Sequence, residues 1–385
     1  MPLRRSVALL VETSNGYSRG LLEGIVAYTK QRANWSIYLS EQERGAMPPK
    51  WLDDWKGDGI IARIETAEIG NRLKTFGVPI VDLSATRHLP NAPWADTDDQ
   101  SIAQLAFDHF KERGFKVFAF CGDPGFAWSV ARCECFKQLA QQAGIDFFEH
   151  EAIARYDSKY SWDREKKRLA VWLQSLPRPT AIMACYDFKA QEVLDVCRQL
   201  QIAVPEEIAV LGVDNDQLLC ELAEPPLSSI IPDTKKTGFD AAQLLDKMMD
   251  GDTVAIDQPL LTKPRGIHIR ASTDILAIED REIASALRYI RLHANENIRV
   301  TDILKEIPLS RRVFEARFRK ALGRTPHDEI LRIRIQRVKE LLQSTDLSIG
   351  QIAWRTGFEH AEYLAAAFKR ETKRSPSDYR REHAV

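Results

Sequence analysis

The chain has 385 residues, of which 44% are hydrophobic and 28% charged, and its formal net charge is −1. The length predicts two or three domains, and the composition is that of a globular protein and excludes a low-complexity chain. The charge is unevenly distributed: from Asp280 onward 22 Lys and Arg face 15 Asp and Glu, a net charge of +7 that leaves −8 for the rest.

A basic tail on an acidic body is typical of a polyanion-binding module joined to a domain that does not bind polyanions. The N-terminal apolar run, residues 7–11, is followed by Glu12 and is too short for a signal-peptide core or a membrane span. No other segment approaches the length of a membrane span, so we expect a cytoplasmic protein that does not contact a membrane.

The six cysteines lack C-x-x-C spacing and are expected to be reduced and mostly buried. The pair Cys133 and Cys135 leaves a metal site as an alternative, but no neighbouring His or Cys completes one. We therefore expect neither a metal nor a cofactor.

The first 270 or so residues alternate between apolar strand-like runs and amphipathic helical stretches. In a first series, strands are predicted at 7–11, 35–39, 59–62 and 78–83, with helices at 20–30 and near 65–76. A second series has strands at 117–121, 181–184 and 208–212 and helices at 101–113, near 132–142, at 163–175 and at 188–200. This order predicts an α/β fold of two doubly wound lobes with parallel sheets and a cleft between them.

Residues 275–285 have mixed charge and no strand pattern, and they are interpreted as a linker. The predicted organisation is a two-lobed domain at 1–274, the linker, and a helical domain at 286–385.

Polar and aromatic side chains that follow the predicted strands are the candidates for lining the cleft, because ligands of such folds bind outside the carboxyl ends of the strands. Amides, carboxylates, an Arg fork and aromatic faces together suit a small polyhydroxylated ligand such as a sugar. The same residues also cap helices and form turns, so each has a purely structural alternative. The candidates are Asn15, Tyr17, Arg19, Trp128, Arg132, Tyr186, Asp187, Asp214 and Asn215.

Residues 300–385 contain one pattern twice: a short helix, a tight turn and a basic second helix. Phe318-Arg319-Lys320 and Phe368-Lys369-Arg370 lie fifty positions apart, as do Thr325-Pro326 and Ser375-Pro376. Each unit is a helix-turn-helix that can place its second helix in a DNA major groove, and two units suggest that two adjacent grooves are read. The alternative is a plain helical bundle with solvated basic faces.

Family resemblance supports this reading. The run 210–215, the segment 227–230 and the ending Arg270-Ala-Ser-Thr-Asp274 resemble the effector domain of the lactose-repressor and periplasmic sugar-binding group, while the doubled motif resembles the AraC/XylS regulators. The two in this order resemble the bacterial xylose operon regulators, which implies xylose as effector, a double-stranded DNA operator and gene activation. The lactose-repressor group carries its DNA-binding helices before the effector domain; here a strand is already predicted at 7–11, so we expect the doubled C-terminal motif to read DNA instead.

The resemblance also implies which residues face DNA. In the first motif Ser310 is expected to cap the second helix. Arg311, Arg312, Glu315 and Ala316 are expected to lie off the core face and to bind DNA, the last three facing bases, while Arg317, Arg319 and Lys320 are expected to contact phosphates. In the second motif the corresponding positions are His360, Ala361, Glu362, Ala365, Ala366 and Lys369. His360 stands where a capping Ser or Asp is usual, and Lys373 stands where Gly is usual. The second motif is therefore expected to contribute more to positioning the protein on DNA than to discriminating between bases.

The leading hypothesis is thus a sugar-responsive transcription regulator, expected to act as a homodimer. A transport-type sugar-binding protein and an α/β enzyme remain as alternatives. No G-x-G-x-x-G, P-loop, H-E-x-x-H or G-x-S-x-G motif supports an enzyme, and no partner is identifiable for Asp98, Asp187 or Asp214 as a general base.

Overall fold

A computed structural model describes residues 4–155, 157–256, 258–275, 277–278 and 280–383. The chain divides into two compact units, Met1–Ile275 and Leu276–Val385. Within the described residues, no helix is both long and apolar enough to cross a membrane.

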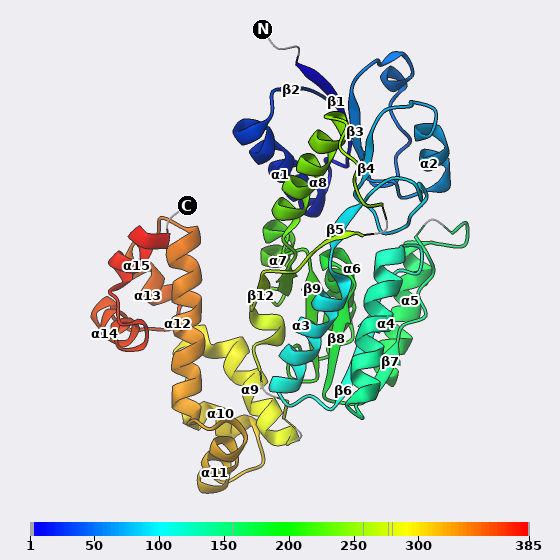
Figure 1. Ribbon diagram of the computed structural model, residues 1–385. Coiled ribbons are helices and arrows are strands. Elements are labelled where there is room, and N and C mark those ends of the chain that lie inside the picture. Colours follow the sequence, from blue (N-terminus) through cyan, green and yellow to red (C-terminus); the bar gives the residue numbers. More distant parts are fainter. Residues whose placement is uncertain (1–3, 156, 257, 276, 279, 384–385) are drawn as a thin grey trace. The chain divides into compact units, whose positions relative to one another are not determined.

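The first unit contains two lobes, each built on its own sheet (Figure 1). The first lobe has four parallel strands in the order β2-β1-β3-β4, and the second has six in the order β12-β10-β9-β8-β6-β7, where only β12 is antiparallel. A separate parallel pair joins β11 to β5. The strands are β1 (Arg5–Leu10), β2 (Trp35–Leu39), β3 (Gly59–Ala62), β4 (Ile80–Asp82), β5 (Ala95–Thr97), β6 (Val117–Cys121), β7 (Asp146–Glu149), β8 (Thr180–Ala184), β9 (Ile208–Val213), β10 (Ser228–Ile231), β11 (Leu260–Thr262) and β12 (Gly266–His268).

Helices cover both sheets because their apolar stripes match the buried runs of the strands. They are α1 (Gly16–Arg32), α2 (Ala67–Leu73), α3 (Asp99–Glu112), α4 (Ala127–Gln142), α5 (Trp162–Ser175), α6 (Asp187–Gln199), α7 (Gln217–Leu222) and α8 (Thr234–Met249), with short 3-10 turns at Lys50–Asp54 and Ala271–Thr273.

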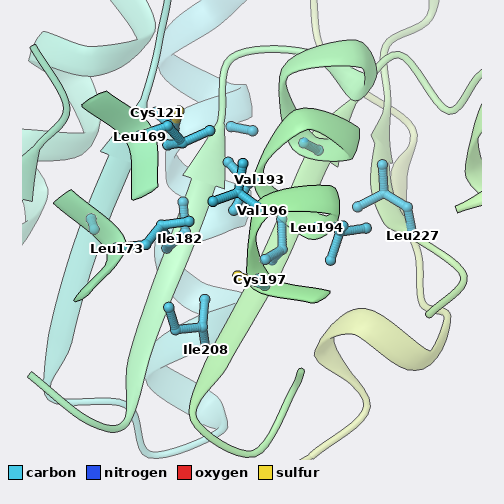
Figure 2. Close-up of a cluster of buried hydrophobic side chains, with 14 of the residues drawn as sticks. Cys121, Leu169, Leu173, Ile182, Val193, Leu194, Val196, Cys197, Ile208 and Leu227 are labelled. Atoms are coloured by element: carbon cyan, nitrogen blue, oxygen red, sulfur yellow. The ribbon is translucent and has the colours of Figure 1, made fainter. Parts of the chain in front are cut away.

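One continuous apolar cluster forms the core between the sheet of the second lobe and the helices α5 and α6. Leu169 and Leu173 of α5 and Val193 of α6 pack against Ile182 of β8 and Ile208 of β9 (Figure 2). All five side chains are buried, and at roughly 1.5 to 3 kcal/mol for each buried aliphatic side chain such a cluster fixes α5 and α6 against the sheet.

Helix α8 returns to the first lobe and lies beside α1 (Figure 1). Its Ala241 and Leu245 share a core with β1. Glycines permit the close approach: a Cβ on Gly24 would lie 2.0 Å from the Lys235 carbonyl oxygen, and one on Gly238 would lie 2.0 Å from the Leu21 oxygen. The chain therefore passes between the lobes three times, after β5, after β10 and after β11.

These findings refine the sequence predictions. Strands β2, β3 and β6 have the predicted bounds, and the predicted helices are present with ends shifted by a few residues. The prediction of two lobes formed by two successive series was incomplete, because α8 and β11 belong with the first lobe although they follow the second series in the chain.

The second unit is helical, with α9 (Arg281–His293), α10 (Val300–Glu306), α11 (Arg311–Leu322), α12 (Pro326–Ser344), α13 (Ile349–Arg355), α14 (Ala361–Thr372), α15 (Pro376–His383) and a 3-10 turn at Ala294–Glu296. The predicted linker 275–285 was too long. Asp280 accepts a hydrogen bond from the Ile283 N–H and caps α9, so residues 281–285 are helical. Of that segment, Leu276 and Glu279 lie outside the described residues.

Candidate ligand pocket and nucleic-acid interface

A pocket lies between the two lobes, at the carboxyl ends of their parallel strands. Arg63 directly follows β3 and Asp214 directly follows β9. Groups of both charges and aromatic rings therefore face one small space, as the binding of a polar ligand requires. Its lining residues are Tyr17, Arg44, Arg63 and Asp96 from the first lobe and Trp128, Arg132 and Asp214 from the second.

Tyr17 and Asp96 form a buried pair on the first-lobe side. The Tyr17 hydroxyl donates to Oδ1 of Asp96 at 2.8 Å, and the Thr97 N–H donates to the same oxygen at 2.7 Å. Burial raises the pKa of Asp96, and the nearby Asp99 carboxylate raises it further. Among the described residues Oδ2 of Asp96 has no hydrogen-bond partner, so a ligand hydroxyl can donate to it.

Arg63 is a buried cation held by two acids. Its guanidinium lies 3.5 Å from Glu12 Oε1 and 2.9 Å from Glu65 Oε1, and it stacks 4.9 Å from the Tyr17 ring centroid. Burial opposes its charge, but Glu12 and Glu65 keep the pKa of Arg63 well above its ordinary value. The charge is thus permanent and its position is fixed by the pairing.

Arg132 occupies the second-lobe side in a similar way. Its Nε donates to Asp99 Oδ1 at 2.6 Å and its Nη1 donates to the Cys185 carbonyl at 2.7 Å. The guanidinium carbon lies 4.9 Å from the Trp128 ring centroid. The N-terminal part of α4 positions both side chains, since Trp128 and Arg132 are one helical turn apart.

Three aromatic rings, which we call the aromatic wall, pack together beside the pocket, and one of them, Trp128, lines it. Trp128 stacks on Phe126 with centroids 5.0 Å apart and meets Tyr186 edge-on at 5.7 Å. The Arg44 guanidinium carbon lies 5.1, 5.5 and 5.3 Å from the centroids of Phe126, Trp128 and Tyr186. Arg44 comes from the first lobe and the rings from the second, so this cation–π cluster joins the two lobes across the pocket.

Asp214 carries the least satisfied charge in the pocket. Its carboxylate makes no hydrogen bond within the described part of the chain, and its backbone has a φ of 111°, a conformation that costs a non-glycine residue energy. Burial raises the pKa of Asp214 to about 6, although Arg132, Arg44 and Arg63 oppose the rise. A strained, partly desolvated carboxylate in a pocket is the arrangement that a hydrogen-bonding ligand relieves.

The other predicted ligand residues are engaged in the fold. Asn15 caps α1 by accepting from the Ser18 N–H at 2.8 Å. Arg19 is half-exposed and pairs with Asp216 at 3.8 Å. The Tyr186 hydroxyl accepts a hydrogen bond from Arg155, and its ring belongs to the aromatic wall.

Asp187 and Asn215 hold the loop after β9 in place. Asp187 accepts from the Ser229 hydroxyl at 2.6 Å and from the Asp216 N–H at 2.8 Å, and Asn215 accepts from Arg270 at 2.9 Å. The structure thus brings together Tyr17, Trp128, Arg132 and Asp214, with the Tyr186 ring behind them, but places the carboxylate of Asp187 and the amide oxygen of Asn215 in structural contacts.

Sequence reasoning missed Arg44, Arg63 and Asp96. Arg63 directly follows a correctly predicted strand, so the rule applied to the other strands could have found it. Asp96 lies in β5, a strand of three residues with no visible alternation, and Arg44 lies five residues beyond β2 in an irregular loop. No local pattern distinguishes these two from surface charges.

The helical unit contains two helix-turn-helix motifs, α10–α11 and α13–α14, joined by α12. Phe314 and Phe318 are fully buried, as their spacing predicted, and Phe368 is the equivalent residue in the second motif. Thr325 forms a capping box with Asp328 at the start of α12, which explains the Thr-Pro signal in physical terms. Lys373 ends α14 with a φ of 62°, where Gly323 ends α11 with 70°.

Most predicted DNA-facing residues of the first motif are exposed on α11. Arg312, Ala316 and Arg319 are exposed, whereas Arg311 pairs with Glu315 at 2.8 Å. Ser310 is the N-cap residue, but its hydroxyl makes no capping hydrogen bond, contrary to the prediction. Its backbone φ and ψ place it before the helix without requiring that bond.

Arg317 was predicted to contact a DNA phosphate, but the structure places it in ion pairs within the protein. It donates to Asp280 at 2.7 and 2.6 Å and to Glu282 at 2.9 Å, so its charge ties α11 to the start of α9 instead of facing a phosphate.

In the second motif, α14 begins at Ala361 after the N-cap residue His360, which makes no side-chain cap. Glu362, Ala366 and Lys369 are exposed, and Ala361 and Ala365 are partly exposed. The surface of α14 thus offers small side chains where α11 offers arginines.

Comparison with known proteins matches three successive segments of the chain to family models. Residues 6–104 match the model of the XylR N-terminal domain, residues 107–273 that of the periplasmic binding protein-like domain, and residues 303–382 that of a helix-turn-helix domain.

Two curated relatives are similar over almost their whole length. A xylose operon regulatory protein of Escherichia coli K12 is 32% identical over 98% of this chain and 97% of its own, and that of Haemophilus influenzae is 31% identical over 97% of each. A solved structure described as the xylose-binding transcription activator xylR superposes with a TM-score of 0.85 at 31% identity, covering both chains completely. A complex of the regulator CelR with cellobiose shares the fold of the first unit, with a TM-score of 0.56 at 21% identity.

Proposed function

The chain belongs to the family of xylose operon regulatory proteins, and from that premise we propose that xylose binds between its two lobes and controls how its helix-turn-helix unit engages DNA. The observation that carries the proposal is the unpartnered carboxylate of Asp214, which faces Arg132 and Arg44 beside the aromatic wall. The carboxylates accept from sugar hydroxyls, the guanidinium groups donate to sugar oxygens, and the ring of Trp128 covers an apolar sugar face.

The pocket draws on both lobes, so a sugar that contacts both stabilises one relative arrangement of them. Arg63 and Asp96 come from the first lobe, and Arg132 and Asp214 from the second. A ligand shifts such an equilibrium only through its different affinities for the two arrangements. Contacts made on both sides at once supply that difference.

The direction of regulation in this proposal is activation of genes for pentose breakdown, as the relative described as a transcription activator suggests. The proposal includes a homodimer, because two-lobed effector domains pair and regulators often bind repeated half-sites. It places the protein in the cytoplasm, where its DNA is accessible.

The helix-turn-helix unit distinguishes this proposal from a transport-type binding protein. An enzyme is the remaining alternative. It is tested by incubating the protein with xylose and following the sugar by NMR: saturable binding without a new product supports a regulator.

The central experiment measures operator binding by fluorescence anisotropy with and without xylose, using DNA upstream of pentose catabolic genes. We expect xylose to tighten binding by the wild-type chain and Asp214→Asn to remove that response. Asp54→Asn is the matched control, because Asp54 is an exposed carboxylate outside the pocket. Equal DNA binding with and without xylose would contradict xylose as the effector or its coupling to DNA binding. If the wild-type chain binds no DNA specifically under either condition, the assignment of the helical unit as the DNA-binding unit is contradicted.

A further inference from the structure

A groove separates the two helix-turn-helix motifs, and we call it the inter-motif groove. Its lining carries three arginines: Arg299 precedes α10, Arg311 begins α11 and Arg334 lies along α12. Two imidazoles also line it, those of His327 in the first turn of α12 and of His360 before α14. The one lining carboxylate, Glu359, accepts a hydrogen bond from the Asn297 amide at 2.8 Å. The groove is therefore predominantly positive.

Arg334 is the unusual member of this lining. The residue is only 8% exposed, yet within the described residues it has no salt bridge. Its Nε donates to the Ala294 carbonyl at 2.7 Å, its guanidinium carbon lies 5.8 Å from the Phe358 ring centroid, and its buried Nη2 has no hydrogen-bond partner. Glu359 offsets part of this charge from a distance, but burial still lowers the pKa of Arg334, and no acceptor contacts the buried Nη2. A buried cation with an unsatisfied donor is costly, so its presence points to an anion that completes the site.

The backbone beside Arg334 is shaped to hold the guanidinium there. Gly357 adopts a φ of 75°, and a Cβ at this position would lie 2.5 Å from the Ala294 oxygen and 3.0 Å from Nε of Arg334. A side chain at 357 would displace the arginine from its carbonyl. The turn of the second motif thus maintains the position of this cation.

The groove also touches the beginning of both recognition helices. Arg311 is the first residue of α11 and His360 is the N-cap of α14, and both line the groove. His360 makes no side-chain cap, so the first N–H groups of α14 are open to another acceptor. In a helix-turn-helix the N-terminal end of the second helix contacts base edges. When α11 and α14 read neighbouring major grooves, the DNA backbone between those grooves faces the inter-motif groove.

We propose that the inter-motif groove binds a backbone phosphate of the DNA segment between the two major grooves, with Arg334 as its buried anchor and Arg299 and His327 at its rim. This rests on the proposed function only in requiring that both motifs engage one duplex. The phosphate balances the charge of Arg334 and sets the register of the two motifs without reading sequence.

The test uses the full chain and a fluorescein-labelled duplex selected by it from a randomised pool. Each phosphate between the two contacted major grooves is replaced in turn by an uncharged methylphosphonate. We expect at least one replacement to weaken binding by the wild-type chain about tenfold, the effect of losing one charge-assisted hydrogen bond. The same replacement should cost Arg334→Met little, because the phosphate and the arginine act as one pair.

Arg299→Ala and His327→Ala address the case in which Arg334→Met does not fold, because both residues are exposed. Both variants should weaken DNA binding, and Arg299→Ala should reduce the magnitude of the slope of log affinity against log salt by about 0.9 for a lost phosphate contact. Arg337→Met is the matched control on α12, since Arg337 is exposed, pairs with Glu340 and does not line the groove. Its slope should equal that of the wild type.

Each other outcome overturns the proposal in a recognisable way. If no methylphosphonate position matters, or if sensitivity is equal in the wild type and all groove variants, the groove does not hold DNA. If inorganic phosphate binds at Arg334 but does not weaken DNA binding, the groove is a small-anion site instead. If the wild-type chain selects no duplex at all, the proposed function fails and the groove proposal fails with it.

Discussion

Replacing Asp214 by Asn should make the unliganded protein more stable while weakening its hold on xylose. The pKa of this carboxyl rises from 3.8 to about 6 on folding, so ionising it in the folded chain costs roughly 3 kcal/mol more than in the unfolded chain. Solvent screening of the partly exposed side chain lowers the expected gain to about 1 to 2 kcal/mol. Asn removes this cost and tolerates the positive φ at least as well as Asp.

The sign depends on pH in a defined way. Because the folded-state pKa lies above the unfolded one, ionisation of Asp214 destabilises the fold increasingly between about pH 4 and pH 6 and constantly above. The difference in melting temperature between Asp214→Asn and the wild type should therefore be near zero at pH 4 and reach a few degrees at pH 8. Thermal unfolding followed by circular dichroism measures it, with Asp54→Asn as the control that shifts at neither pH.

The same variant should lose roughly 1.5 to 3 kcal/mol of xylose binding, which is about 10- to 150-fold in Kd, because a charge-assisted hydrogen bond is lost. Titration calorimetry at pH 8 measures this. A lower melting temperature accompanied by weaker binding would refute the reasoning, because it would mean that Asp214 holds the fold together. Unchanged affinity would remove Asp214 from the binding site.

Four further results are expected. Xylose affinity of the wild type should fall by about tenfold for each pH unit below pH 6 and be flat above pH 7, because only the ionised Asp214 accepts two sugar hydroxyls; affinity that is independent of pH would contradict this. Arg312→Ala should weaken binding to the selected duplex by roughly 1 to 3 kcal/mol and relax specificity at one base pair, which repeated selection with the variant would reveal. Arg317→Ala should lower the melting temperature, because the pairing with Asp280 is lost, and leave the salt dependence of DNA binding unchanged. Arg319→Ala should leave the melting temperature unchanged and reduce the magnitude of the slope of log affinity against log salt by about 0.9. Equal slopes for these two variants would show that the structural and DNA-facing assignments are wrong.

The helical unit was predictable in detail because its signals are local. Phe314 and Phe318 lie one turn apart and therefore share a face, and Thr325 with Pro326 starts a helix through a capping box. Arg317 was misassigned because its partner Asp280 lies 37 residues away, at a helix start that periodicity alone did not mark.

The residues of the ligand pocket also divide into those that local sequence signals predict and those that they do not. Four pocket residues were predicted because they follow strands or lie near the starts of helices, where the neighbouring residues indicate the position of the side chain: Tyr17, Trp128, Arg132 and Asp214. Asp187 has the same local signature, yet it hydrogen-bonds Ser229 across the sheet instead of facing the pocket.

By itself the sequence determined the strands and helices, the order of a two-lobed α/β unit and a doubled helix-turn-helix, and the edge of each sheet where a ligand would bind. These depend on hydrophobic periodicity, capping and turns within a few residues. Only the tertiary structure decided that α8 returns to the first lobe, that Arg44, Arg63 and Asp96 complete the pocket, and that Arg334 lies buried between the motifs with one donor unsatisfied. Packing between segments far apart in the chain settles which polar groups meet, because the same local pattern is compatible with a solvated surface, a structural ion pair or a binding site.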